Sequence, residues 1–289
     1  MDHKPFLFIP GKKTLDDYKT KDTGSENDKK RVLEGFEKDL GRLTELQDKL
    51  YAHDKYGVLI ILQAMDAAGK DGVIKHVMSG MNPQGCQVKS FKAPSTEELD
   101  HDYLWRCNKA LPERGNIGIF NRSYYEEVLV TKVHPQILEF QKLPGFKITK
   151  AKEIWKSRYD EINQFEKYLV NNGIIVLKFF LHVSKEEQKK RFLSRINDPS
   201  KNWKFTINDL NERKYWDDYK IAYGDILANT TTKWAPWYVI PADKKWFMRA
   251  LVAHILVSEL ESLNLHYPIV GEEQKKGILK AKEILEKEK

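Results

Sequence analysis

The sequence is poor in several features that mark particular protein classes. It holds only two cysteines, Cys86 and Cys107, without the paired spacing of a zinc site or redox motif, so we expect free thiols in a reducing cytosol. Only 16 glycines and 11 prolines occur in 289 residues, which excludes collagen and low-complexity chains. No apolar run approaches the roughly 20 residues of a membrane span, and the first residues show no secretory apolar region. We therefore expect a cytoplasmic protein that does not bind membranes.

Positive charge is in excess. The chain carries 49 Lys and Arg against 42 Asp and Glu, which gives a formal net charge of +7. A basic surplus of this kind indicates a polyanionic partner, such as nucleic acid, an anionic membrane or a phosphate-rich small molecule. Composition does not choose among these partners, so the choice depends on motifs.

Short apolar runs alternate with helical patterns from Tyr56 onward. The runs predict strands at 58–62, 88–91, 117–120, 174–183 and 237–240. The patterns between them predict helices at 72–81, 96–110, 151–171, 184–192 and 244–263. We expect Asp243 to cap the last of these helices. The alternation predicts an α/β fold with a parallel sheet covered by helices on both faces.

One domain, 1–289, is the simplest organisation. Residues 1–55 are expected to form an N-terminal helical flank, in which an amphipathic helix follows a loosely ordered start. Residues 195–235 are polar, basic and aromatic, which favours a mobile helical lid over a core element. Residues 270–289 predict a solvated, charged C-terminal helix.

A turn of small residues with a Gly-Lys pair follows the first expected strand. Compared with the Walker A phosphate loop (P-loop), the segment 64–71 has Ala64 in place of the first glycine and Asp71 in place of the hydroxyl residue. Small residues still let backbone N–H groups approach phosphate oxygens, and Lys70 supplies a point charge at a helix N-terminus. Asp66 and Asp71 would repel bound phosphate unless a cation intervenes, which predicts Mg²⁺. The alternative is a turn that only packs tightly.

Arg122 follows the third expected strand, in the segment Phe-Asn-Arg-Ser-Tyr-Tyr-Glu-Glu over 120–127. The carboxyl ends of parallel strands form the ligand-binding edge of a sheet, so we expect Arg122 in the same crevice as Lys70. A rigid guanidinium suits the oxygens of a phosphate and the charge that moves during its transfer. The alternative is an Arg–Glu pair on the surface.

A basic run follows the fourth expected strand. Arg191 and Arg195 are four residues apart and share a helix face, and Lys201 and Lys204 follow in the expected lid. A solvated basic face is the usual explanation of such a run. Its position after a strand, where a kinase lid would close, favours anion binding instead.

Together these motifs resemble the family 2 polyphosphate kinases, relatives of thymidylate kinase that move a phosphoryl group between inorganic polyphosphate and a nucleotide. The resemblance covers roughly residues 40–263. It is carried by Asp66-Ala67-Ala68-Gly69-Lys70-Asp71-Gly72, by Arg122-Ser123-x-Tyr125, and by Arg191-Phe192-x-x-Arg195 with Asp198-Pro199-x-Lys201-x-Trp203-Lys204. It implies a P-loop kinase-like fold with a parallel sheet, flanking helices and a helical lid.

The resemblance also implies roles for individual residues. Mg²⁺ would bind through Asp66 and through the residue that ends the third strand, which is Asn121 here where the family has an acid. Members confined to nucleoside diphosphates tend to have Asn where this chain has Glu126, so the chain resembles the branch that accepts both AMP and ADP. The alternative is that Glu126 is a plain ion-pair partner. The phosphate acceptor is already an anion, so no general base is required.

The resulting hypothesis divides the site residues into three groups. Asp66, Lys70 and Arg122 are expected to be catalytic, with Asp66 as the metal ligand. Asp71, Asn121 and Glu126 are expected to bind nucleotide. Polyphosphate is expected to bind to the following cations: Lys70, Lys75, Arg122, Arg191, Arg195, Lys201 and Lys204. The sequence does not indicate which side of the crevice holds polyphosphate.

Two other functions fit parts of the sequence. An ATP-dependent nucleoside monophosphate kinase would use the same scaffold, but Asp71 after Lys70 and the long basic lid argue against it. A non-enzymatic nucleic-acid binder would explain the charge of +7 and the 11% of aromatic residues, but no recognition module is visible. We therefore expect polyphosphate and nucleotides as partners, no nucleic acid, and a homo-oligomer.

Overall fold

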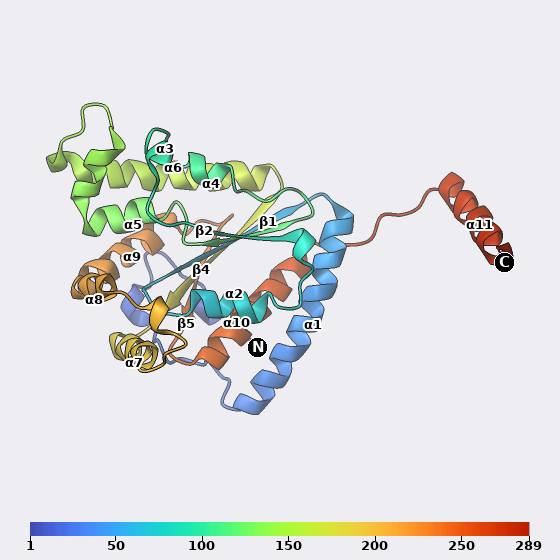
Figure 1. Ribbon diagram of the computed structural model, residues 1–289, viewed down its shortest axis with the longest axis horizontal. Helices are drawn as coiled ribbons and strands as arrows, with labels where there is room; N and C mark the ends of the chain where they lie inside the picture. The colour runs from blue at the N-terminus through green and yellow to red at the C-terminus, as the bar shows by residue number, and fades with distance from the viewer. Residues whose placement is uncertain (289) are drawn as a thin grey trace.

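The computed structural model describes residues 1–288 and shows a central sheet between two layers of helices (Figure 1). The strands are β1 (Gly57–Ala64), β2 (Cys86–Ser90), β3 (Ile117–Asn121), β4 (Ile174–His182) and β5 (Trp237–Pro241). They pair in the order β2-β3-β1-β4-β5, and every pairing is parallel. The strands expected from the apolar runs are confirmed, and so is the α/β fold.

Helices cover both faces of the sheet. One face carries α1 (Lys29–His53), α2 (Lys70–Val77) and α10 (Lys245–Ser262). The other face carries α4 (Trp105–Asn108), α5 (Glu126–Val133), α6 (Ala151–Asn171) and α9 (Trp216–Thr230). Alternate residues of β1 join the two cores, Ile60 on the first face and Ile61 on the second. All of β1 is buried, which explains why its sequence is an unbroken apolar run.

The remaining elements are short, or lie outside these two layers. The α-helices among them are α3 (Thr96–Leu99), α7 (Lys185–Ile196), α8 (Ile207–Lys214) and α11 (Glu272–Lys287). The 3-10 helices are η1 (Lys4–Phe6), η2 (Leu15–Asp17), η3 (Pro83–Gly85), η4 (Pro135–Gln141), η5 (Ile148–Lys150) and η6 (Asn202–Lys204).

The parallel sheet brings four connections to one edge. The segment 65–69, which the sequence predicts to be a phosphate loop and which keeps that name below, follows β1. Residues 122–125 follow β3, α7 follows β4, and residues 242–244 join β5 to α10. The central strand β1 has β3 on one side and β4 on the other. This is the kind of switch point at whose carboxyl edge open α/β sheets bind ligands.

Three local expectations are wrong. The helix expected over 96–110 is interrupted, because the Asp102 carboxylate accepts the Leu104 N–H at 2.9 Å and a new turn begins there. Asp243 does not cap α10; it accepts the Ser184 N–H at 2.8 Å and so ties the start of α7 to the end of β5. The N-terminal residues are not loosely ordered, since the Phe8 side chain is buried and its N–H donates to the Trp237 carbonyl at 2.9 Å.

The segment expected to be a lid has two different parts. Much of η6 and α8 is exposed, with 76% of Trp203 and 70% of Ile207 accessible to solvent. In contrast, α9 buries Tyr223 and Ile226 in the second core, where it packs on α5 and α6. A mobile lid over all of 195–235 is therefore wrong for α9, which belongs to the body of the protein.

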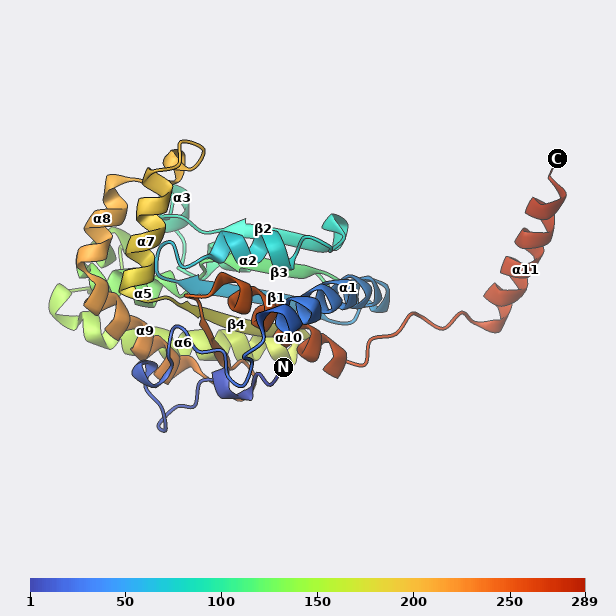
Figure 2. The ribbon, with the colours of Figure 1, turned by 90° about the horizontal axis from the view of Figure 1, so that it is seen from below.

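The last helix stands apart. No residue of α11 is buried, and the helix projects from the body at the end of an extended segment (Figures 1 and 2). The helix expected over 270–289 is present over Glu272–Lys287, and Lys289 lies outside the described residues. Within residues 1–288, no helix is both long and apolar enough to cross a membrane.

Candidate active site

The phosphate loop is held in an unusual backbone conformation. Gly69 has a φ of +121°, and Ala67 has a φ of +59°, which is costly for a residue with a Cβ. Lys70 folds back, and its Nζ donates to the Ala64 carbonyl at 3.0 Å. This bond closes the loop from the end of β1 to the start of α2. Backbone strain of this kind collects at ligand-binding sites, where the surrounding structure has to maintain it.

Helix α7 supplies that support. The Nε2 atom of Gln188 donates to the Asp66 carbonyl at 2.9 Å, and Nη1 of Arg191 donates to the carbonyls of Ala67 and Ala68 at 3.1 and 2.5 Å. The Oε1 atom of Gln188 accepts from Arg213 of α8 at 2.6 Å. Three successive carbonyls of the phosphate loop are therefore fixed by α7, and the Gln188 amide connects the loop to α8.

Arg191, which is expected to bind polyphosphate, contacts the protein itself in this structure. Its guanidinium is buried, and its other nitrogens donate to the Ala242 carbonyl at 2.5 Å and to Glu187 at 2.9 Å. All of its donor nitrogens are engaged, and two of the contacts hold the phosphate loop. Its role in polyphosphate binding stays a prediction.

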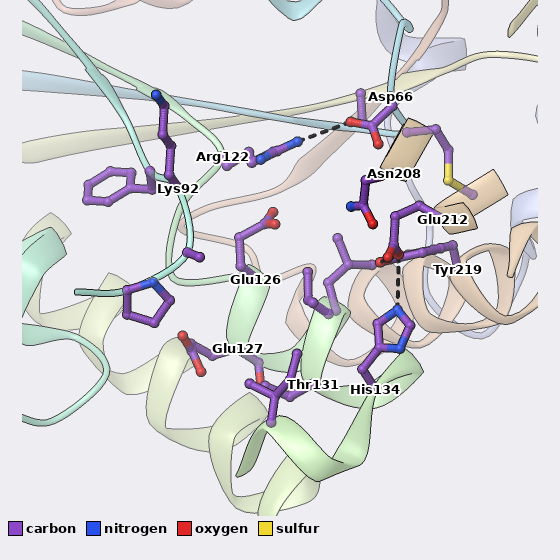
Figure 3. Close-up of a pocket in the computed structure, with 18 of the residues that line it drawn as sticks. Asp66, Lys92, Arg122, Glu126, Glu127, Thr131, His134, Asn208, Glu212 and Tyr219 are labelled. Carbon is purple, nitrogen blue, oxygen red and sulfur yellow. Dashed lines mark hydrogen bonds and ion pairs between the residues drawn. The ribbon is translucent and has the colours of Figure 1, made fainter. Parts of the chain in front are cut away.

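Arg122 and Asp66 face each other across the carboxyl ends of β3 and β1. The Nη2 atom of Arg122 lies 3.0 Å from Oδ1 of Asp66, and both side chains are about one-third exposed, at 39% and 31% (Figure 3). Arg122 has a left-handed backbone, with a φ of +64°. Beside this pair, Nδ2 of Asn121 donates to Oδ1 of Asp71 at 3.0 Å. The structure thus brings these four expected site residues together.

Burial strongly affects the charges in this group. Burial lowers the pKa of Lys70, and repulsion from Arg122 lowers it further, against the attraction of Asp66. Burial also raises the pKa of Glu126, although Arg122 and Lys70 favour its ionised form. The site therefore holds partly desolvated charges of both signs, which is typical of a site that binds a charged ligand.

A buried network fixes the segment that carries Arg122 and Glu126. The hydroxyls of Tyr124 and Tyr125 donate to Oε1 of Glu166 at 2.9 and 2.7 Å. Lys178 of β4 donates to Oε2 of Glu166 at 2.6 Å and to the Tyr125 hydroxyl at 3.0 Å, with no exposed surface on either charged side chain. The ion pair is anchored on β4 and α6, so it holds the turn after β3 against the body of the protein.

A cavity of about 620 Å³ opens beside these residues. It extends from Asp66 and Arg122, past Glu126, to a pair at its other end, where Nε2 of His134 lies 3.0 Å from Glu212 of α8 (Figure 3). Its other walls are largely apolar and include Phe91, Leu99, Leu129, Val130, Ile137 and Phe140. Cavities of roughly 300–1,000 Å³ with apolar walls and a few convergent polar groups accommodate small-molecule ligands.

Of the cations expected to bind polyphosphate, Arg122 lines this cavity and Lys70 does not. Neither Lys75 nor Arg195 lines it, and the same is true of Lys201 and Lys204. Lys75 is exposed on α2, Lys201 pairs with Asp198, and the Lys204 ammonium lies 5.0 Å from the centre of the Trp203 ring. Their role in polyphosphate binding stays a prediction.

The side chains available for a metal are few. Among residues 1–288, no group of three or more His, Cys, Asp or Glu residues could hold a metal ion. Mg²⁺ usually needs only one or two carboxylates, because water and substrate phosphates complete its shell. Asp66 fits this pattern, since only its Oδ1 atom accepts from Arg122. Asn121 is engaged with Asp71 and offers no second carboxylate.

Glu126 gives the protein a pH-dependent stability that can be measured. Its raised pKa means that the folded state binds this proton more tightly than the unfolded chain does. The folded state therefore carries an unfavourable charge above the raised pKa, and this penalty disappears as the pH falls below the ordinary value of 4.5. We expect Glu126→Gln to raise the melting temperature at pH 7, with a difference from wild type that shrinks toward pH 4.

Melting curves across this pH range test the prediction. Glu139→Gln, at an exposed glutamate, is the matched control and should leave the melting temperature nearly unchanged. A Glu126→Gln variant that melts below wild type at pH 7 would show that the ionised carboxylate stabilises the fold.

Comparison with known proteins places the chain in a family. The family model described as polyphosphate kinase 2 matches residues 26–267. An ADP-polyphosphate phosphotransferase of Rhodopseudomonas palustris is 52% identical over 84% of both chains. An AMP/ADP-polyphosphate phosphotransferase of Meiothermus ruber is 45% identical over 84% of this chain and 86% of its own. The crystal structure of polyphosphate kinase 2 from Arthrobacter aurescens has a TM-score of 0.85, with 38% identity and 94% of each chain covered. The chain therefore belongs to the polyphosphate kinase 2 family.

Proposed function

We propose that this protein transfers phosphoryl groups reversibly between inorganic polyphosphate and nucleotides, converting AMP to ADP and ADP to ATP. The observation that carries the proposal is the pair of Arg122 and Asp66 at one end of a nucleotide-sized cavity, with Lys70 close enough to interact electrostatically with both. The relatives named as ADP- and AMP/ADP-polyphosphate phosphotransferases support the same reaction. They favour it over an ATP-dependent kinase or a nucleic-acid binder.

Positioning and charge neutralisation account for most of the catalysis of phosphoryl transfer. Lys70 and Arg122 supply two fixed cations at the carboxyl ends of β1 and β3. The pairing of Arg122 with Asp66 holds the guanidinium at the end of the cavity that both residues line. Asp66 would hold Mg²⁺, which supplies further positive charge to the phosphates when it is bound. The acceptor phosphate is an anion at neutral pH, so none of the histidines is needed as a base.

The cavity provides the nucleotide site. Its apolar middle suits a base, and its end at Arg122 suits the phosphates of the acceptor. Asp71 and Asn121 would position those phosphates, and Glu126 stands between the two ends of the cavity (Figure 3). Glu126 and the Meiothermus ruber relative together support a subclass that uses both AMP and ADP.

A product analysis tests both the reaction and the subclass. With Mg²⁺ and polyphosphate, we expect AMP to yield ADP and ADP to yield ATP, and we expect chelation of the metal to stop both reactions. ADP that forms from AMP only when ATP is supplied would identify a nucleoside monophosphate kinase. ATP formation from ADP without any use of AMP would keep the reaction and reject the subclass.

Three further expectations are proposals of the same kind. We expect a cytoplasmic enzyme, a homo-oligomer, and closure of the exposed part of the lid, η6 and α8, over bound substrate. The exposure of Trp203 and Ile207 supports the last of these, because apolar side chains of this size gain from being covered.

A further inference from the structure

A second cavity, of about 560 Å³, lies between α1, α7 and the start of α10. It shares no lining residue with the nucleotide-sized cavity. Four of its lining side chains are basic: Lys190 of α7, Lys244, Lys245 and Arg249. We call these four residues the α10 cluster. Lys244 and Lys245 follow β5, so the cluster lies at the same sheet edge as the phosphate loop.

The α10 cluster lacks anionic partners. Within the described part of the chain, none of its four side chains forms an ion pair or a hydrogen bond, and the Nε atom of Arg249 is buried without an acceptor. The two acids that line the cavity are engaged elsewhere. Glu187 pairs with Arg191 at 2.9 Å, and Asp243 accepts the Ser184 N–H at 2.8 Å. Three exposed lysines and one partly buried arginine, all unpaired and lining one cavity, leave a site that an anion would stabilise.

The neighbouring charges add to this imbalance. The pKa of Lys245 is lowered by burial and by repulsion from Arg191, Arg249 and Lys201, which the attraction of Glu187 offsets only in part. The pKa of Arg249 is lowered by burial and by Arg191. The cluster therefore holds more positive charge than the neighbouring acids neutralise.

The cluster is continuous with the phosphate loop. The Nη2 atom of Arg249 lies 3.6 Å from the position that a Cβ on Gly72 would occupy, two residues after Lys70. The adjacent Met248 side chain lies 3.0 Å from the corresponding position on Gly69. A chain of phosphates that starts at Lys70 would therefore meet Arg249 next and Lys245 one helical turn away.

We propose that the α10 cluster binds the distal part of the polyphosphate chain and thereby gives the enzyme a preference for long donors. The proposal rests on the proposed function for the identity of the donor. It places polyphosphate on the α10 side of the phosphate loop and nucleotide in the cavity at Arg122. Polyphosphate fits better than nucleic acid, because the cluster continues a phosphate-binding loop and offers charge at successive positions.

The test compares donors of two lengths in the full-length enzyme. In Lys245→Ala/Arg249→Ala we expect the KM for long-chain polyphosphate to rise about tenfold with kcat nearly unchanged, since two phosphate contacts are lost. The KM for tripolyphosphate should rise by no more than about threefold, because a donor of three phosphates that starts at Lys70 meets Arg249 but does not extend to Lys245. This second donor also shows that the variant is folded. Lys276→Ala/Lys280→Ala on α11 removes the same charge far from the site and should change neither KM.

Direct binding of long-chain polyphosphate, measured without turnover, keeps the result independent of the reaction. Weaker binding by the α10 variant, with unchanged binding by the α11 variant, would support the proposal. A wild-type enzyme that binds polyphosphate but transfers no phosphate would reject the proposed function and leave the binding site in place. An unchanged KM and affinity for long chains would overturn the proposal, as would equal losses for both donors. Loss of binding to a single-stranded oligonucleotide, with polyphosphate binding retained, would assign the cluster to nucleic acid instead.

Discussion

Replacement of Arg122 by alanine is expected to lower kcat with polyphosphate and AMP by about 10²–10³-fold, the effect typical of losing one preorganised donor to a developing charge. Arg122 is the only arginine that the turn after β3 brings to the phosphate loop, and Asp66 holds its guanidinium at 3.0 Å. The fold should survive, because the side chain is 39% exposed and contributes little to either core. Steady-state kinetics on the variant provide the measurement.

Two further substitutions separate the charge from the backbone. Arg122→Lys keeps a cation but loses the planar fork, so most of the loss in kcat should remain. Arg122→Gly should lose as much activity as Arg122→Ala. Its free energy of unfolding should exceed that of Arg122→Ala by about 1 kcal/mol, because glycine accepts the φ of +64° without strain. An alanine variant with near-wild-type turnover would remove Arg122 from the mechanism.

The second large effect concerns stability. Glu166→Ala is expected to reduce the free energy of unfolding by about 3–5 kcal/mol, because it leaves the Lys178 ammonium buried without a counter-ion. The same change removes the acceptor of the Tyr124 and Tyr125 hydroxyls. Chemical denaturation, followed by fluorescence, measures the loss. Turnover should fall as well, because the turn that carries Arg122 loses its support.

An exposed ion pair supplies the control. Glu45→Ala breaks contacts with Arg42 and Lys49 on the surface of α1 and should leave the denaturation midpoint nearly unchanged, because solvent screens an exposed pair. Replacing Glu166 and Lys178 together by apolar residues should be less damaging than the single change, since no uncompensated charge remains. If Glu166→Ala proves as mild as Glu45→Ala, the buried pair does not carry the stability assigned to it.

The sequence was sufficient to predict the sheet and the centre of the site, because both depend on local patterns. Buried parallel strands are mostly apolar runs, which located β1, β3, β4 and β5, whereas the exposed edge strand β2 has a mixed sequence and was located from its place between two helical patterns. The carboxyl ends of such strands share one edge, so Asp66, Lys70 and Arg122 could be expected together. The deviations of the phosphate loop from its usual pattern did not obscure it, because small residues and a lysine were retained.

The burial of individual side chains and the partners that they contact could not be predicted in the same way. Helical spacing shows that Arg191 and Arg195 share a face, but it does not show that Arg191 is buried under the phosphate loop. The polar and aromatic composition around α9 concealed a buried stripe that includes Tyr223 and Ile226. The α10 cluster could not be recognised either, because the sequence shows only an amphipathic helix over 244–263 and not that Lys190 lies beside its start. These three features depend on the packing of residues that are distant in the sequence.

The amide of Gln188 makes two features of the enzyme difficult to change separately. One end of the amide holds the Asp66 carbonyl, and the other holds Arg213 of α8. A substitution that loosens α8 to speed the release of product would therefore also disturb the phosphate loop. In directed evolution, gains in turnover from α8 should tend to appear with losses in donor affinity, until a second change at position 188 separates the two traits.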